Sequence, residues 1–226
     1  MLAIIKKELK SYFYTPIGYI FIGLFLAVVS FIFYTYTFAS GYLNFEYIIW
    51  DSTVVLAFII PVLTMRMFAE EKKSGTDQLL MTSPKSITCI VLGKFLAASL
   101  VVVIGMLFMF VYYGILRHFG HVNLTEPLVA MLGFLLLAMS YISFGMFASS
   151  ITENQVIAAV ISIGFFLIIS FLQTYQGIIE MFSLVQMYQK FPQGIISLKE
   201  VVGYITFILL FMFLTIIVLQ RRKSVK

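Results

Sequence analysis

The sequence predicts an all-α integral membrane protein with six transmembrane helices, an N-terminal amphipathic interfacial helix, and short extracellular re-entrant helices between spans five and six. Composition is the first reason, since 62% of the 226 residues are hydrophobic and only 11% are charged, against about 25% charged in soluble domains. The second is that the apolar residues form runs long enough to cross a bilayer. The third is that basic residues collect in alternate connecting segments, as in other multi-pass proteins.

The chain begins with an amphipathic segment, residues 1–15. Its apolar side chains recur at helical spacing on one arc, and lysines lie beside that arc. Such a helix lies in the membrane interface with its apolar side in lipid. Pro16 is expected to end it. The apolar set is Leu2, Ile5, Leu9, Tyr12 and Phe13, and the lysines are Lys6, Lys7 and Lys10.

Six apolar runs follow within one predicted domain of residues 1–226. They cover about residues 17–38, 52–68, 87–116, 127–150, 155–172 and 201–219. At 1.5 Å per residue the first is roughly 33 Å long, enough to cross a bilayer. Pro61 predicts a kink in the second run, and part of the long third run is expected to stand in the cytoplasm. The spaced small residues Gly93/Ala97 and Gly145/Ser149 predict close helix contacts within the chain.

Residues 173–200 are too polar to span the membrane and too apolar for a free loop. They predict short helices that dip into the outer leaflet. Aromatic residues that mark this side of the membrane lie at the end of the first run and after it; they are Tyr34, Tyr36, Tyr42, Tyr47 and Trp50.

The distribution of basic residues sets the predicted orientation. With the N-terminus inside, twelve of the fifteen Lys and Arg residues lie on the inner side, and only Arg117, Lys190 and Lys199 lie outside. Both termini and residues 70–85 are therefore predicted to be cytoplasmic.

The longest charged segment, residues 70–85, joins the second and third runs and is the predicted binding element. Ser74 is placed to cap a short helix, with Asp77 as the acidic residue three positions later. Pro84 stops that helix. Exposed leucines on a short helix at the membrane surface indicate a protein partner, and a solvated loop is the alternative interpretation. The predicted shared face consists of Thr76, Leu79, Leu80 and Ser83.

The sequence contains no pattern that indicates an enzyme. His118 and His121 are the only histidines, and zinc sites take three or four ligands. Cys89 is the single cysteine, so it forms no internal disulfide, and no histidine lies on its side of the membrane to act as a base. Gly93-Lys94 is only the tail of a phosphate-binding loop. No cofactor or nucleic acid is therefore expected, and ATP would have to be bound by a partner subunit.

Ion-driven transport is disfavoured, because no predicted span holds a carboxylate near its centre, where proton and sodium relays lie. Asp51, Glu126 and Glu153 fall at the edges of the runs. Lys94 and Arg66 are near the inner surface and are expected to extend their charges toward water.

Residues 58–96 carry a more specific pattern. An acidic pair, Glu70-Glu71, is followed by a basic pair, by Gly75-Thr76, by Leu79-Leu80 and by Pro84, and Gly93-Lys94 comes next. This order resembles the ABC-2 family of ABC transporter permeases, and in particular the small bacterial branch that includes the gliding-motility-type permeases. The layout of the whole chain agrees with that family.

The resemblance implies half of a membrane domain in the bacterial cytoplasmic (inner) membrane. The chain would pair with a second permease chain, identical or related, and with two copies of a cytoplasmic ABC ATPase, and it would contact membrane lipids. Residues 74–84 would be the coupling helix seated in the ATPase, and the turn around Glu153 a smaller second contact. The implied coupling residues are Glu70, Glu71, Ser74, Gly75, Thr76, Asp77, Leu79, Leu80, Pro84 and Glu153.

Three functions remain open at this point. The first is export of a lipidic, glycan, peptide or drug-like substrate, powered by the separate ATPase. The second is a membrane subunit that couples an ATPase to a mechanical or anchoring role without a transported solute. The third, an autonomous channel or carrier, is disfavoured by the missing carboxylates. A neighbouring gene for an ATPase would exclude the third function.

Overall fold

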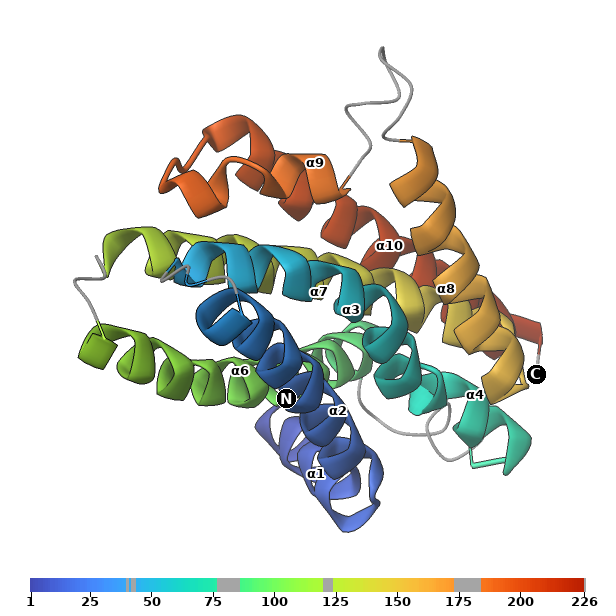
Figure 1. Cartoon of the computed structure of the whole chain (residues 1–226). Coiled ribbons are helices and arrows are strands. Elements are labelled where there is room, and N and C mark those ends of the chain that lie inside the picture. The colour runs from blue at the N-terminus through green and yellow to red at the C-terminus, as the bar shows by residue number, and fades with distance from the viewer. Residues whose placement is uncertain (40, 42–43, 77–85, 120–123, 173–183, 226) are drawn as a thin grey trace.

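The described elements of the chain are all helices (Figure 1). The computed structural model describes every residue except 40, 42–43, 77–85, 120–123, 173–183 and 226. The predicted all-α membrane fold is confirmed. In chain order, the elements are α1 (Leu2–Tyr14), α2 (Ile17–Tyr34), the π-helical turn η1 (Thr35–Ala39), α3 (Phe45–Thr64), α4 (Arg66–Lys73), α6 (Ile87–Phe119), α7 (Thr125–Ile151), α8 (Gln155–Leu172), α9 (Leu184–Tyr188), the 3-10 turn η3 (Phe191–Gln193) and α10 (Leu198–Val225).

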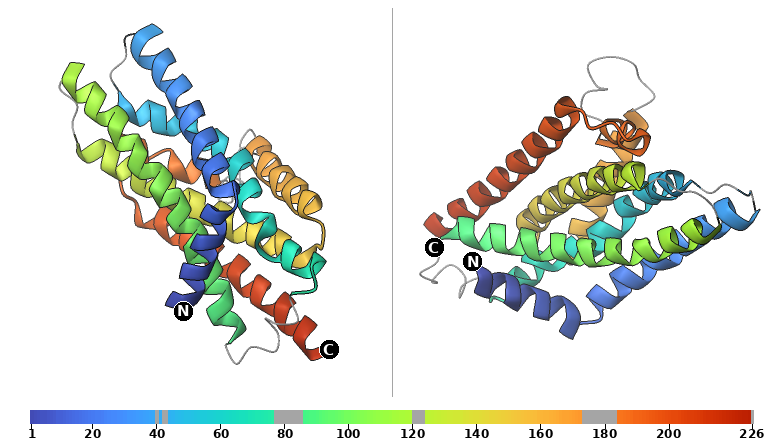
Figure 2. Two further views of the ribbon diagram at one scale, coloured as in Figure 1. Left: turned by 90° about the horizontal axis from the view of Figure 1, so that it is seen from below. Right: turned by 90° about the vertical axis from the view of Figure 1, so that its left-hand side faces the viewer.

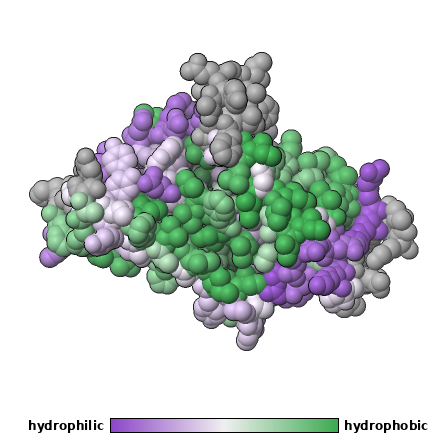
Figure 3. Space-filling model, turned by 45° about the vertical axis from the view of Figure 1, so that its right-hand side comes forward, coloured by the Kyte–Doolittle hydropathy of each residue, from purple (hydrophilic) through white to green (hydrophobic). Residues whose placement is uncertain are grey.

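Five helical stretches within the described residues are long and apolar enough to cross a membrane. They are Ile17–Ala39, Phe45–Lys73, Ile87–Phe119, Thr125–Ile151 and Leu198–Arg222. The other predicted span corresponds to α8, which is apolar over Gln155–Ser170 but shorter. In the space-filling view of Figure 3, an apolar band crosses the middle of the molecule and hydrophilic residues gather on either side of it.

Helix α7 lies at the centre of the bundle (Figures 1 and 2). It packs against α3, α10, α8, α6 and α4, and it is the most buried of the candidate spans. Aromatic rings fix its contacts with α8 and α10. The ring of Phe144 stacks on that of Phe165 with centroids 3.7 Å apart and meets the edge of Phe211 at 4.9 Å. Stacked and edge-on rings of this kind stabilise beyond the area they bury.

The second predicted span is broken into α3 and α4, and the break lies at Met65 rather than at Pro61. The hydroxyl of Ser149 on α7 fills the gap. It accepts hydrogen bonds from the amides of Phe68 and Ala69, both at 3.1 Å, and donates to the Met65 carbonyl at 2.9 Å. A hydroxyl inserted between carbonyl i and amide i+4 is a recognised cause of helix kinking.

Close approach of α3 and α7 makes this insertion possible. Any Cβ at Gly145 would lie 2.9 Å from the Cβ of Thr64, so only glycine fits. The contact predicted for the Gly145/Ser149 pair is therefore confirmed, and it lies within the chain.

Replacing Ser149 by alanine is expected to destabilise the chain by about 1–3 kcal/mol, because buried backbone groups at the break lose their partner. The adjacent Ser150→Ala is the matched control, since the Ser150 hydroxyl donates only to the Phe147 carbonyl on its own helix, at 2.7 Å. Equilibrium unfolding in mixed micelles, titrated with SDS, measures both. Equal unfolding of the two variants would contradict the role given to Ser149.

Two helices extend beyond the predicted spans. Helix α3 begins at Phe45 rather than at residue 52, so it includes Tyr47 and Trp50. Helix α10 runs to Val225 rather than ending at residue 219. Both extensions add polar residues that the apolar pattern alone leaves out, and Glu46 in the first turn of α3 suits the positive end of a helix.

The segment between α8 and α10 contains short helices, as predicted, in its described part from residue 184 onward. Tyr188 of α9 is buried, and its hydroxyl donates to the Ala130 carbonyl of α7 at 3.0 Å. Phe191 in η3 is also buried. These turns therefore pack onto α7, and their depth in the outer leaflet stays a prediction.

Candidate functional site

Most of the ionic contacts lie at one end of the bundle, here called the charged end. It is formed by α1, α4, the first turns of α6, the α7–α8 turn and the last turns of α10. Both termini lie at this end in the right-hand view of Figure 2. The contacts that join these elements are described in order below.

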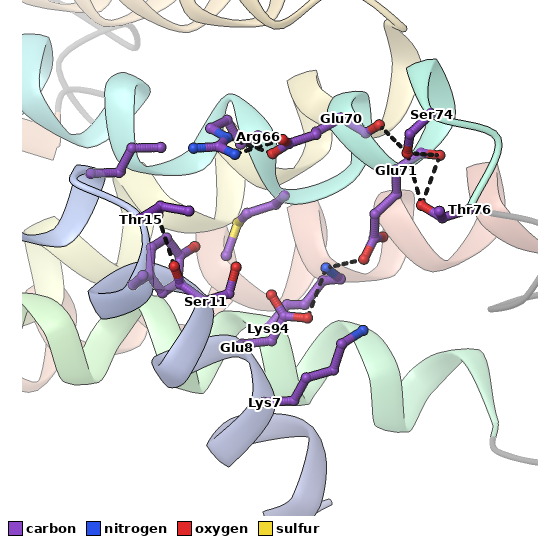
Figure 4. A pocket seen from close by; sticks show the side chains of 13 residues that line it. Lys7, Glu8, Ser11, Thr15, Arg66, Glu70, Glu71, Ser74, Thr76 and Lys94 are labelled. Atoms are coloured by element: carbon purple, nitrogen blue, oxygen red, sulfur yellow. Dashed lines mark hydrogen bonds and ion pairs between the residues drawn. The ribbon is translucent and has the colours of Figure 1, made fainter.

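Lys94 on α6 is the centre of the charged end (Figure 4). Its ammonium group lies 3.1 Å from a carboxylate oxygen of Glu8 on α1 and 2.8 Å from one of Glu71 on α4. The Lys94 side chain is 3% exposed. The prediction that Lys94 extends toward water is therefore wrong: two carboxylates meet its charge inside the protein, and a buried ion pair needs such additional partners. We call Lys94, Glu8 and Glu71 the Lys94 triad.

Two further basic residues of α4 are held within the chain. Both guanidinium contacts of Arg66 go to the Glu70 carboxylate, and the Arg66 side chain stays 26% exposed, in keeping with its predicted extension toward water. Lys72 donates to the carbonyl of Ser150 on α7. Residues 70–73, predicted as the start of a loop, are the last turn of α4.

The chain turns sharply where α4 ends. The Ser74 hydroxyl donates to the Glu70 carbonyl at 2.8 Å, and the Thr76 hydroxyl to that of Glu71 at 3.3 Å. Gly75 between them has φ of +72°, a left-handed conformation that favours glycine. Among the residues that the structure describes, a Cβ at Gly75 would meet no neighbour within 4 Å, so the left-handed conformation is the reason that the structure shows for glycine here.

The remaining predicted coupling residues, Asp77, Leu79, Leu80 and Pro84, lie outside the described residues. The short helix over residues 74–84, with Ser74 as its cap, therefore stays a prediction. Within the described part, the Ser74 hydroxyl binds a backbone carbonyl, that of Glu70, at the C-terminal end of α4.

Glu153 lies in the tight turn between α7 and α8, as predicted. Its carboxylate is 2.8 Å from the guanidinium group of Arg222 on α10, and its side chain is 66% exposed. An ion pair this exposed contributes only about 0–1 kcal/mol. The turn is thus open to a partner at the same end of the bundle as residues 70–76.

A cavity of about 280 Å³ opens between α1, α4 and α6 at this end. Its lining includes the Lys94 triad, Arg66 and Tyr12. Burial raises the pKa of Tyr12, so its phenol stays neutral at physiological pH. Among the residues that the structure describes, no three His, Cys, Asp or Glu side chains are grouped to hold a metal. Lys94 and Arg66 are each paired with carboxylates beside this cavity, an arrangement that positions helices rather than performs chemistry.

The sequence analysis missed the Lys94 triad. The signal was a lysine about two turns inside an apolar helix together with a single glutamate, Glu8, among the lysines of the first segment. Ionisable residues inside apolar segments are usually paired. The pairing could have been proposed, although the sequence does not say which carboxylate approaches.

Comparison with known proteins gives one finding. A family model described as "ABC-2 family transporter protein" matches residues 41–224. The matched range begins just before α3 and ends in the last turn of α10. A search of curated proteins finds no match.

Proposed function

Since the chain belongs to the ABC-2 family of transporter proteins and is thus a membrane subunit of an ABC transporter, we propose that it exports a lipidic, glycan, peptide or drug-like substrate. A separate ATPase subunit, in two copies, would bind and hydrolyse ATP. A second permease chain, identical or related, would complete the membrane domain. The charged end would face the cytoplasm of a bacterial cell, with the protein in the inner membrane, in keeping with the basic residues collected there.

The coupling part of this proposal rests on one observation. Three helices, α1, α6 and α7, contact α4 immediately before residues 74–85. The Lys94 triad ties it to α1 and α6, and Ser149 and the Ser150 carbonyl tie it to α7. A segment that receives work from an ATPase must be stiffly connected, or its motion is absorbed locally. Docking of residues 70–85 in the ATPase, with a smaller contact at Glu153, would then pass motion through α4 to the central helix α7.

Co-expression with an ABC ATPase encoded by a neighbouring gene tests the proposal. We expect the two subunits to purify together and, in vesicles, ATP hydrolysis to rise when an exported substrate is supplied. Failure of the ATPase to purify with the chain would overturn the proposal. A complex that hydrolyses ATP but responds to no solute would instead support the mechanical role.

Labelling of an introduced cysteine checks the orientation. In a Cys89→Ser background, Ser83→Cys is expected to react with a membrane-impermeant maleimide only after the cells are opened, because residues 70–85 are placed inside. Asn44→Cys, on the opposite side in this scheme, is the control and should react in intact cells. Efficient labelling of Ser83→Cys from outside would reverse the assignment.

A further inference from the structure

The end of the bundle opposite the charged end holds a second polar cavity, of about 500 Å³. The first turns of α3 form one wall, the start of α7 another, and the connection from α9 to η3 the third. No part of the proposed coupling mechanism uses this cavity. Its lining includes Glu46, Tyr47, Trp50, Glu126, Gln189 and Gln193.

Two carboxyl groups face this cavity without a basic partner. Glu46 is 9% exposed, and the cavity lining contains both Glu46 and Glu126. Among the described residues neither forms an ion pair, and Lys190 on the neighbouring connection is already paired with Glu200 at 2.7 Å. A buried carboxylate without a compensating cation is costly. A bound cation would therefore lower the cost of ionising carboxyl groups that the cavity lining leaves uncompensated.

The aromatic wall beside the carboxyl pair is firmly held. The ring of Trp50 stacks on that of Tyr188 with centroids 5.6 Å apart and planes 13° apart. Tyr188 is itself fixed by its hydrogen bond to the Ala130 carbonyl. Tyr47, one turn before Trp50 on α3, is half-exposed and stacks on Tyr36. Ring faces of Trp and Tyr attract organic cations, and Trp does so best.

We propose that this cavity binds an organic cation, with an ammonium group between the Glu46–Glu126 pair and the rings of Trp50 and Tyr47. A divalent metal fits less well, because calcium takes six to eight oxygen ligands and no group of three acidic, His or Cys side chains gathers in the described residues. A neutral sugar would stack on the rings but leave the carboxyl charge unbalanced. The ammonium group could belong to a small free amine or to a lipid headgroup.

Trp50 makes the proposal directly measurable, since it is the single tryptophan of the chain. Choline titrated into the purified permease in a maltoside detergent is expected to change tryptophan fluorescence in a saturable way. Its uncharged isostere, 3,3-dimethylbutan-1-ol, should cause no saturable change. An equal response to choline and to the isostere would show that binding does not depend on positive charge, and it would overturn the proposal.

Variants assign the response to the carboxyl pair. Glu46→Gln combined with Glu126→Gln is expected to weaken choline binding at least tenfold. Glu153→Gln is the control for removing a carboxylate, because Glu153 lies at the charged end, is 66% exposed and does not line the cavity. Unchanged unfolding in SDS shows that each variant is folded. Unchanged choline affinity in the double variant would overturn the proposal.

Nanodiscs distinguish the two sources of the ammonium group. With phosphatidylglycerol alone, choline should bind as in detergent. If added phosphatidylethanolamine abolishes the choline response, the site is occupied by a headgroup; if the response persists, the site takes a small free cation. Both results support the inference, and a lack of any choline response in either medium refutes it. The permease is tested alone, so failure here leaves the proposed coupling to an ATPase intact.

Discussion

Lys94→Met is expected to destabilise the chain by about 3–5 kcal/mol, the range found when one partner of a buried ion pair is removed. The methionine fills the space of the lysine stem, so packing changes little. What changes is electrostatic, because the carboxylates of Glu8 and Glu71, only 13% and 18% exposed, are left facing each other without a cation. The SDS concentration at the unfolding midpoint should fall accordingly.

A triple variant separates charge from packing. Lys94→Met together with Glu8→Gln and Glu71→Gln removes all three charges at once and is expected to recover most of the lost stability, since replacing a whole buried ion cluster is often nearly neutral. Lys73→Met, at an exposed position at the end of α4, is the control for removing one lysine charge. If Lys94→Met unfolds like Lys73→Met, the triad is not a buried ion cluster.

The apolar runs were enough to predict the helical membrane fold, because length and hydrophobicity determine which segments can cross a bilayer. The apolar runs did not predict where the helices begin and where they break. The start of α3 at Phe45 and the break at Met65 depend on tertiary contacts, namely Tyr188 beneath Trp50 and the Ser149 hydroxyl in the helix gap. The break between α3 and α4 is caused by Ser149, which lies on another helix, so the sequence around Met65 does not indicate it. For that reason the kink was predicted at Pro61.

Only part of the candidate site could be predicted from the sequence, for a similar reason. The motif placed residues 70–76 and Glu153 at the charged end, and the structure brings them to one end of the bundle. Sequence alone predicted that Lys94 extends its charge toward water, because it does not reveal Glu8 and Glu71 as its partners. The carboxyl pair of Glu46 and Glu126 was missed entirely, since its members are eighty residues apart and each looks like an ordinary helix-start glutamate.

The contacts of α4 change how coupling to the ATPase must be tested. Glu70 and Glu71 are among the coupling residues that the family resemblance implies, and Lys72 and Lys73 are the basic pair that follows them. Glu71 belongs to the Lys94 triad, Glu70 binds Arg66, and Lys72 binds the Ser150 carbonyl. Substitution of any of these three would disturb the fold as well as the contact. Of the four, Lys73 is the exposed one and the suitable control.

Leu79→Asp and Leu80→Asp are therefore expected to release the ATPase, while Lys73→Ala leaves it bound. The two leucines are the bulky aliphatic residues of the predicted coupling helix. Burying one leucine in a partner stabilises by about 1.5–3 kcal/mol, so losing it and placing a carboxylate in the pocket should lower ATPase retention at least tenfold. Lys73→Ala removes only an exposed charge, worth about 0–1 kcal/mol.

Co-purification of the ATPase with each variant, followed by ATP hydrolysis in vesicles, measures this asymmetry. Unfolding in SDS should be the same for all three variants, because residues 74–85 follow the anchored part of α4 and the Lys94 triad is untouched. A leucine variant that folds normally but loses the ATPase places the contact on residues 74–84. If both leucine variants keep the ATPase and its activity at the wild-type level, that segment is a solvated loop, and the ATPase must dock elsewhere on the charged end.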